Sequence, residues 1–133
     1  NALYALGLAE DAALSLRGRE LGLSPDLRVN EVMDIYWRQM AYAHSRDAAW
    51  DWLTPRFDEV TARIPEKNRV QVAALPGFFC SGERRDEVEA FFAPKLDEIM
   101  GSPRTLAQSL ERIDLCAALK DLKAAETNAF FDW

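Results

Sequence analysis

The sequence is poor in the residues from which most metal and nucleophilic sites are built. Its 133 residues hold one histidine, His44, and two cysteines, Cys80 and Cys116, with no CxxC pair. A zinc peptidase needs H-E-x-x-H or an equivalent ligand set, which one histidine cannot supply. Two cysteines are also too few for a disulfide-built scaffold. We therefore expect no catalytic, cofactor-binding or metal-binding residues in this sequence.

A basic surface and long apolar runs are missing as well. The chain has 16 Lys and Arg against 22 Asp and Glu, a formal net charge of −6, and no basic stripe. Because a phosphate-binding surface needs a basic excess, we expect no nucleic-acid partner. No apolar run reaches membrane length and no signal peptide is visible, so we expect no membrane contact. Gly82 and Gly101 are isolated turn glycines, not a phosphate-binding loop.

The overall composition is that of an ordinary globular protein, with 49% apolar and 29% charged residues. This length and composition suit one domain with a real core. The chain starts with Asn1-Ala2 and no Met, which indicates a cloning remnant or an internal boundary. We expect residues 1–133 to be a single helical-repeat domain, a fragment of a longer protein.

The clearest element is a helix predicted over Asp47–Ile64. Its large apolar residues follow steps of three and four, which places them on one helical face. We expect Asp47 to cap this helix, Pro55 to kink it and Pro65 to end it. The apolar face is made of Trp50, Leu53, Phe57, Val60 and Ile64.

Similar patterns predict the remaining helices, and no segment alternates like a strand. Glycine, proline and capping residues mark their ends. The expected helices cover Ala2–Leu8, Asp11–Leu21, Asn30 to Tyr42 or His44, Asn68–Leu75, a segment from Ser81 to Ala93-Pro94, a segment begun by Gly101-Ser102-Pro103, and a last helix from about Asp121. The predicted fold class is all-α.

An acidic residue at the predicted N-terminus of a helix recurs along the chain, at Asp11, Asp47, Glu83 and Asp121. The intervals are 36, 36 and 38 residues. Such a period is typical of stacked helical hairpins. We predict a curved array of antiparallel helical hairpins, a HEAT-like or armadillo-like α-α superhelix, rather than a closed bundle. Chance similarity between alanine-rich helices is the alternative.

The residue types that could carry chemistry have structural interpretations. His44 should lie near the end of its helix and donate to free carbonyls. Cys80 and Cys116 are expected to be buried free thiols, although neighbouring hairpins would allow a Cys80–Cys116 disulfide. The remaining charged pairs are interpreted as solvated helix faces: Arg84-Arg85, Asp86-Glu87, Asp58-Glu59 and Asp97-Glu98. The aromatic residues are interpreted as core: Trp50, Trp52, Phe57, Phe91 and Phe92.

Four segments in order carry a family resemblance: Arg46–Leu53 (RDAAWDWL), Phe78–Ser81 (FFCS), Glu87–Phe92 (EVEAFF) and Arg104–Ile113 (RTLAQSLERI). Together they resemble the C-terminal helical domain of the aminopeptidase N family of zinc metallopeptidases, also named after the endoplasmic-reticulum aminopeptidases. Leu23–Asn30 (LSPDLRVN) resembles the family's loop between repeats. The resemblance covers nearly all of residues 2–131, and the style of sequence is similar to bacterial members.

The resemblance implies a parent enzyme that removes N-terminal residues from peptides. Its zinc ligands and catalytic glutamate would lie in an upstream catalytic domain, and no family catalytic residue matches a position here. The domain would cap that catalytic domain, its partner in the same chain, and shape the chamber for the peptide substrate. The compartment stays open between bacterial cytoplasm and periplasm. The alternative function is a free-standing helical-repeat adaptor that binds a protein; a self-sufficient enzyme is the third.

Overall fold

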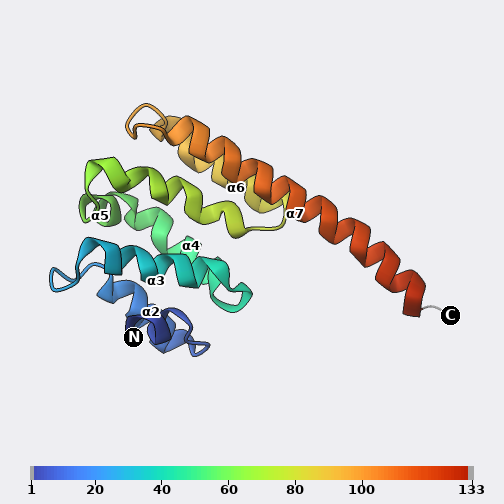
Figure 1. Cartoon of the computed structure of the whole chain (residues 1–133), viewed down its shortest axis with the longest axis horizontal. Helices are drawn as coiled ribbons and strands as arrows, with labels where there is room; N and C mark the ends of the chain where they lie inside the picture. Colours follow the sequence, from blue (N-terminus) through green and yellow to red (C-terminus); the bar gives the residue numbers. More distant parts are fainter. Residues whose placement is uncertain (1, 132–133) are drawn as a thin grey trace.

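The computed structural model describes residues 2–131, and in this range the chain is all-α, with seven α-helices and no strand (Figure 1). The α-helices are α1 (Ala2–Gly7), α2 (Ala12–Leu21), α3 (Val29–Ala41), α4 (Ala43–Leu53), α5 (Phe57–Ala62), α6 (Gly82–Phe92) and α7 (Ser102–Phe131). Three 3₁₀ helices join them: η1 (Thr54–Arg56), η2 (Glu66–Phe78) and η3 (Ala93–Lys95). The prediction of an all-α fold is confirmed.

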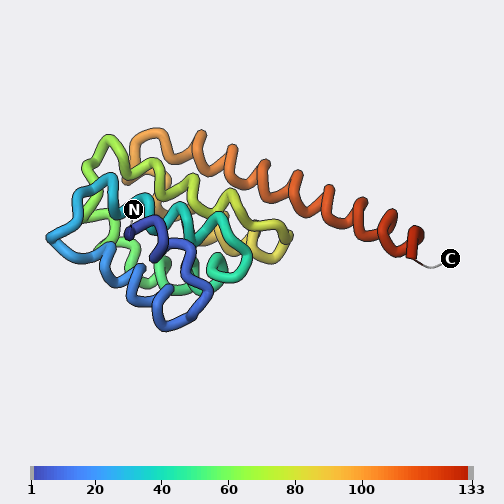
Figure 2. The backbone as a smooth tube through the Cα atoms, turned by 60° about the horizontal axis from the view of Figure 1, so that its bottom comes forward, coloured from blue at the N-terminus to red at the C-terminus, as the bar shows by residue number. Residues whose placement is uncertain are grey.

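The helices lie in two rows. One row runs α1, α3, η2, α7, with each helix packed against the next. The other contains α2, α4 and α6. Helix α3 packs against its hairpin partner α4, and α7 packs against α6 of the preceding hairpin. In the first row, successive helices begin at Val29, Glu66 and Ser102, which are 37 and 36 residues apart. Each hairpin thus adds one helix to each row (Figures 1 and 2).

Contacts between hairpins repeat at the same interval. The Ser109 hydroxyl donates to the Ala73 carbonyl at 2.8 Å across 36 residues. The Arg63 guanidinium donates to the Leu27 carbonyl at 2.9 Å, also across 36 residues. Equivalent positions of neighbouring hairpins therefore lie side by side, as stacking in series requires.

The apolar face predicted on Asp47–Ile64 is confirmed, but the start of its helix is wrong. Trp50, Leu53, Phe57, Val60 and Ile64 are all buried. A 3₁₀ turn that contains Pro55, η1, interrupts the helix where the kink was expected. The helix, however, begins four residues earlier than Asp47, at Ala43 in α4.

The early start of α4 has a local cause. Arg46 donates from Nε and a terminal nitrogen to the carbonyls of Met40 and Ala41, at 2.7 and 2.9 Å. Those carbonyls are at the C-terminus of α3, where a cation is favourable. Asn30 is likewise not a cap, because α3 begins at Val29 and the Arg28 backbone N–H donates to the Glu31 carboxylate at 2.8 Å.

The helix predicted at Asn68–Leu75 is longer and is a 3₁₀ helix, Glu66–Phe78. A 3₁₀ helix has three residues per turn, so side chains three apart lie above one another. Val72 and Leu75 form one fully buried line of η2, and Ala73 and Pro76 form the next. This period of three places η2 between α3 and α7 with two adjacent lines buried.

The last predicted helix, from about Asp121, is not a separate element. α7 runs unbroken from Ser102 to Phe131 and passes through Asp121. No glycine or proline interrupts residues 104–131, so nothing in the sequence stops the helix. Its start is as predicted, with Gly101 at φ 81° turning the chain just before it. The fourth hairpin therefore has only its first helix within residues 2–131.

Candidate functional site

An aromatic cluster joins the second hairpin to the third. Trp50 is fully buried, and its ring centroid lies 5.8 Å from Phe79, 5.5 Å from Phe91 and 6.2 Å from Phe92. Phe57 completes the cluster at 5.3 Å from Phe91, edge to face. Such ring pairs are stabilising beyond the area that they bury. The aromatic residues are core, as predicted; Phe91 alone among these five is only partly buried.

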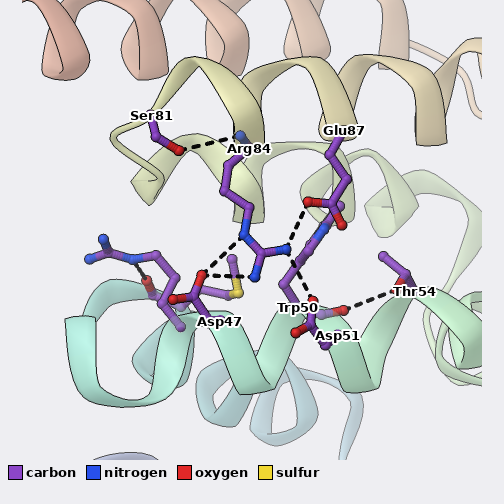
Figure 3. A network of polar contacts seen from close by, with 9 residues as sticks. Asp47, Trp50, Asp51, Thr54, Ser81, Arg84 and Glu87 are labelled. Carbon is purple, nitrogen blue, oxygen red and sulfur yellow. Dashed lines mark hydrogen bonds and ion pairs between the residues drawn. The ribbon is translucent and has the colours of Figure 1, made fainter.

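Above this cluster, Arg84 connects α6 to α4 (Figure 3). Its guanidinium pairs with Asp47 at 2.9 Å, Asp51 at 3.1 Å and Glu87 at 2.8 Å, and lies 5.0 Å from the centroid of the Phe79 ring. Partial burial acts to lower the pKa of Arg84, but the hydrogen bonds to Asp51 and Glu87 outweigh it and raise the pKa above its usual value. Arg84 thus stays a cation that links two hairpins.

Arg85 makes a second set of ion pairs, on the side of α6 that faces α7. It pairs with Asp86, with Glu89, and with Asp114 of α7 at 3.4 Å. The pKa of Arg85 is raised, first by the hydrogen bond to Glu89. The Arg84-Arg85 and Asp86-Glu87 segment was predicted to be only a solvated face. That was wrong for the two arginines, which connect neighbouring helices. No local pattern indicates their partners on α4 and α7.

The two cysteines form a disulfide, so the expectation of two buried free thiols was wrong. Cys80, between η2 and α6, is bonded to Cys116 of α7, with the Cα atoms 5.0 Å apart. This separation is within the range that a disulfide spans. Cys116 is exposed and not on the buried stripe of α7. The usable signal was the 36-residue separation of the cysteines, which equals the interval between hairpins.

A polar cluster lies between α2 and α3, and sequence reasoning missed it. Arg19 is only 5% exposed and donates to the Gln39 side-chain oxygen at 2.7 Å and to the Ser15 hydroxyl at 3.1 Å. Gln39, fully buried, donates to the Ser15 carbonyl at 2.8 Å. Burial lowers the pKa of Arg19, and its Nε has no hydrogen-bond partner. A buried cation is held here by neutral acceptors.

The remaining candidate residues do not assemble. His44 is exposed in the first turn of α4, with its ring centroid 5.8 Å from that of Tyr42. It was predicted near the C-terminal end of the preceding helix, and that was wrong because α3 ends at Ala41. Asp58-Glu59 and Asp97-Glu98 are exposed neighbours. Within residues 2–131 no three His, Cys, Asp or Glu side chains are grouped so that they could hold a metal ion. In the same range no helix is long and apolar enough to cross a membrane.

These features define a class: an all-α domain of stacked helical hairpins, joined by an aromatic cluster, ion pairs and one disulfide. The family model of the ERAP1-like C-terminal domain matches residues 1–115, and the chain belongs to this family. It is thus a C-terminal domain of an aminopeptidase-like protein, a part that is not catalytic. No curated protein and no solved structure matches the chain.

Proposed function

We propose that this domain is the non-catalytic C-terminal part of a zinc-dependent aminopeptidase that removes N-terminal residues from peptides. The observation that supports this most is the family match over residues 1–115. In this proposal the domain caps the catalytic domain of the same protein and shapes the chamber that receives the peptide. The curved array of hairpins, with its concave side toward that chamber, belongs to the same proposal.

The zinc of the proposed enzyme does not fit the residues of this chain. His44 is the single histidine, it is exposed, and it contacts Tyr42 rather than a carboxylate. Both cysteines are in a disulfide and offer no thiolate. The zinc ligands would therefore come from a catalytic domain outside this sequence.

The sequence upstream of Ala2 tests the parentage. An H-E-x-x-H motif followed by a downstream glutamate would support the proposal. An unrelated domain there would overturn it. For the chain itself, we expect metal analysis to find no stoichiometric zinc, and no release of a chromogenic amine from an aminoacyl substrate. One zinc per chain or steady turnover would contradict that expectation.

The chamber role needs a separate test in the parent enzyme. Removing residues 2–131 should change which peptide lengths are cleaved, because the wall of the chamber is lost. Hydrolysis of a small aminoacyl substrate should be affected much less. Equal loss on peptides of every length and on the small substrate would indicate that the domain only stabilises the enzyme.

The disulfide bears on the compartment. Because disulfides persist in oxidising compartments, we propose that the parent matures in one, as a periplasmic enzyme does. Thiol titration of the denatured, unreduced protein isolated from its source should find no reactive thiol, and two after reduction. Two thiols before reduction would overturn this proposal and leave the aminopeptidase parentage untouched.

A free-standing helical-repeat adaptor is the second candidate function. One observation favours it: the second half of α7 carries a row of three leucines, Leu115, Leu119 and Leu122, each more than half exposed. The same upstream sequence decides between the two functions.

A further inference from the structure

The second half of α7 leaves the rest of the molecule. Ile113 is fully buried, Cys116 is tied to Cys80, and beyond these residues the helix extends alone (Figures 1 and 2). From residue 114 to residue 131, α7 has no buried residue. The helix continues nevertheless, because most of its residues are good helix formers and none is glycine or proline.

Three leucines form one face of this extension. Leu115, Leu119 and Leu122 are 64%, 56% and 58% exposed. Steps of four and three residues place them in one row along a helix. Leu115 follows the buried Ile113 by two residues, about 200° around the helix, so this leucine row faces away from the core.

The leucine row continues into a groove between α6 and α7. This groove is open to solvent, has a volume of about 600 Å³, and is lined by both apolar and charged side chains. The residues that line it are Arg85, Glu89, Ala107, Leu110, Glu111, Asp114, Leu115 and Ala118. From Ala107 to Leu122, groove and leucine row run about 22 Å along α7, the length of roughly four helical turns. The small residues Ala107 and Ala118 would let another helix approach closely.

The charge of the groove is negative, because three carboxylates and one arginine line it. Arg85 is the only cation lining it, and it already pairs with Asp86, Glu89 and Asp114. Glu111 is a further exposed carboxylate on the wall. A second copy would bring an equally acidic groove, and an anionic lipid surface would be repelled. A basic polypeptide is attracted instead.

We propose that this groove, together with Leu115, Leu119 and Leu122, binds an amphipathic α-helix of a partner protein, about four turns long, whose apolar face is flanked by Lys or Arg. The leucines and alanines bury the apolar face, and the carboxylates pair with the basic flanks. This inference stands apart from the proposed aminopeptidase function, because it uses only the surface of α6 and α7.

The probe is an 18-residue amphipathic helix of leucine and lysine, with the same peptide carrying glutamate in place of lysine as its counterpart. Fluorescence anisotropy with the whole chain should show binding of the lysine peptide only, weakening as salt rises. The double variant Leu115→Asp/Leu119→Asp should weaken binding at least tenfold. The milder pair Leu119→Ala/Leu122→Ala should weaken it several-fold with the fold intact by circular dichroism.

The matched control is Leu14→Asp/Leu16→Asp, which places the same charges on the exposed leucines of α2. Simple charge attraction predicts tighter binding for both aspartate variants; the proposal predicts a loss for the α7 variant alone. Equal behaviour of the two variants overturns it, as does equal binding of the glutamate peptide. Sedimentation showing a dimer that Leu119→Asp dissociates, or binding to anionic vesicles, would assign the surface to another occupant and also overturn it.

Discussion

Two contacts between neighbouring helices of this domain are built in opposite ways. The contact between α4 and α6 is dry and aromatic, with Trp50 fully buried among phenylalanine rings. The contact between α2 and α3 is polar, with Arg19 buried against the side chains of Gln39 and Ser15. Burying rings adds stability in proportion to area, whereas burying a cation costs desolvation that its hydrogen bonds roughly offset. The first contact should stabilise the fold, and the second should mainly fix how the helices fit.

Trp50→Ala should give the largest loss, because it empties the centre of the aromatic contact. Emptying a buried aromatic site costs about 3–5 kcal/mol of unfolding free energy. Urea unfolding followed by circular dichroism measures it. Phe91→Ala is the internal comparison, and its loss should be smaller because Phe91 is only partly buried. A Trp50→Ala loss below about 0.5 kcal/mol would show that the contact is not the stabilising one.

The disulfide adds a covalent bond to the third hairpin, beside the aromatic contact. The double variant Cys80→Ser/Cys116→Ser removes the cross-link between residues 36 apart in sequence. In the chain-entropy account this should lower the free energy of unfolding by about 3–4 kcal/mol. Unfolding of the wild type in reductant should give nearly the same loss, and the serine variant should not respond to reductant. Similar stability with and without reductant would mean that the bridge does not form in solution.

The polar contact can be tested by breaking it and then replacing it. Gln39→Leu removes the acceptor 2.7 Å from the buried Arg19 and should cost about 1–3 kcal/mol. Arg19→Met/Gln39→Leu removes the cation as well and should recover most of that loss, since buried polar groups are often replaceable by apolar ones. If the double variant is the less stable of the two, the polar contact stabilises the fold as the aromatic one does.

The sequence predicted the burial of the aromatic residues and not that of the polar ones, for a physical reason. Large apolar residues at helical spacing can only be buried, so Trp50, Phe57 and Phe92 identified their faces without knowledge of the partner. Arg19 and Gln39 are ordinary surface residue types in a helix, and their burial depends on how α2 meets α3. Neither side chain was considered for that reason.

The wrong role given to Asp47 and the wrong state given to the cysteines have the same origin. Asp47 suits an N-cap locally, yet in the structure it pairs with Arg84, 37 residues further along. The Cys80–Cys116 bond also depends on the stacking of hairpins. The continuity of α7 past Asp121 was visible in the absence of any helix breaker. Distant partners were the part that single-sequence reasoning could not supply.

Arg84→Met should give the smallest effect and completes the comparison, because Arg84 crosses the aromatic contact on its outer side. The methionine keeps packing on Phe79, so the change reports mainly the ion pairs with Asp47, Asp51 and Glu87. These carboxylates are about half or more exposed, and exposed pairs contribute about 0–1 kcal/mol. The loss should shrink further in about 1 M salt, where such pairs are screened. A loss as large as that of Trp50→Ala, unchanged by salt, would mean that the polar bridge and not the ring cluster holds α4 to α6.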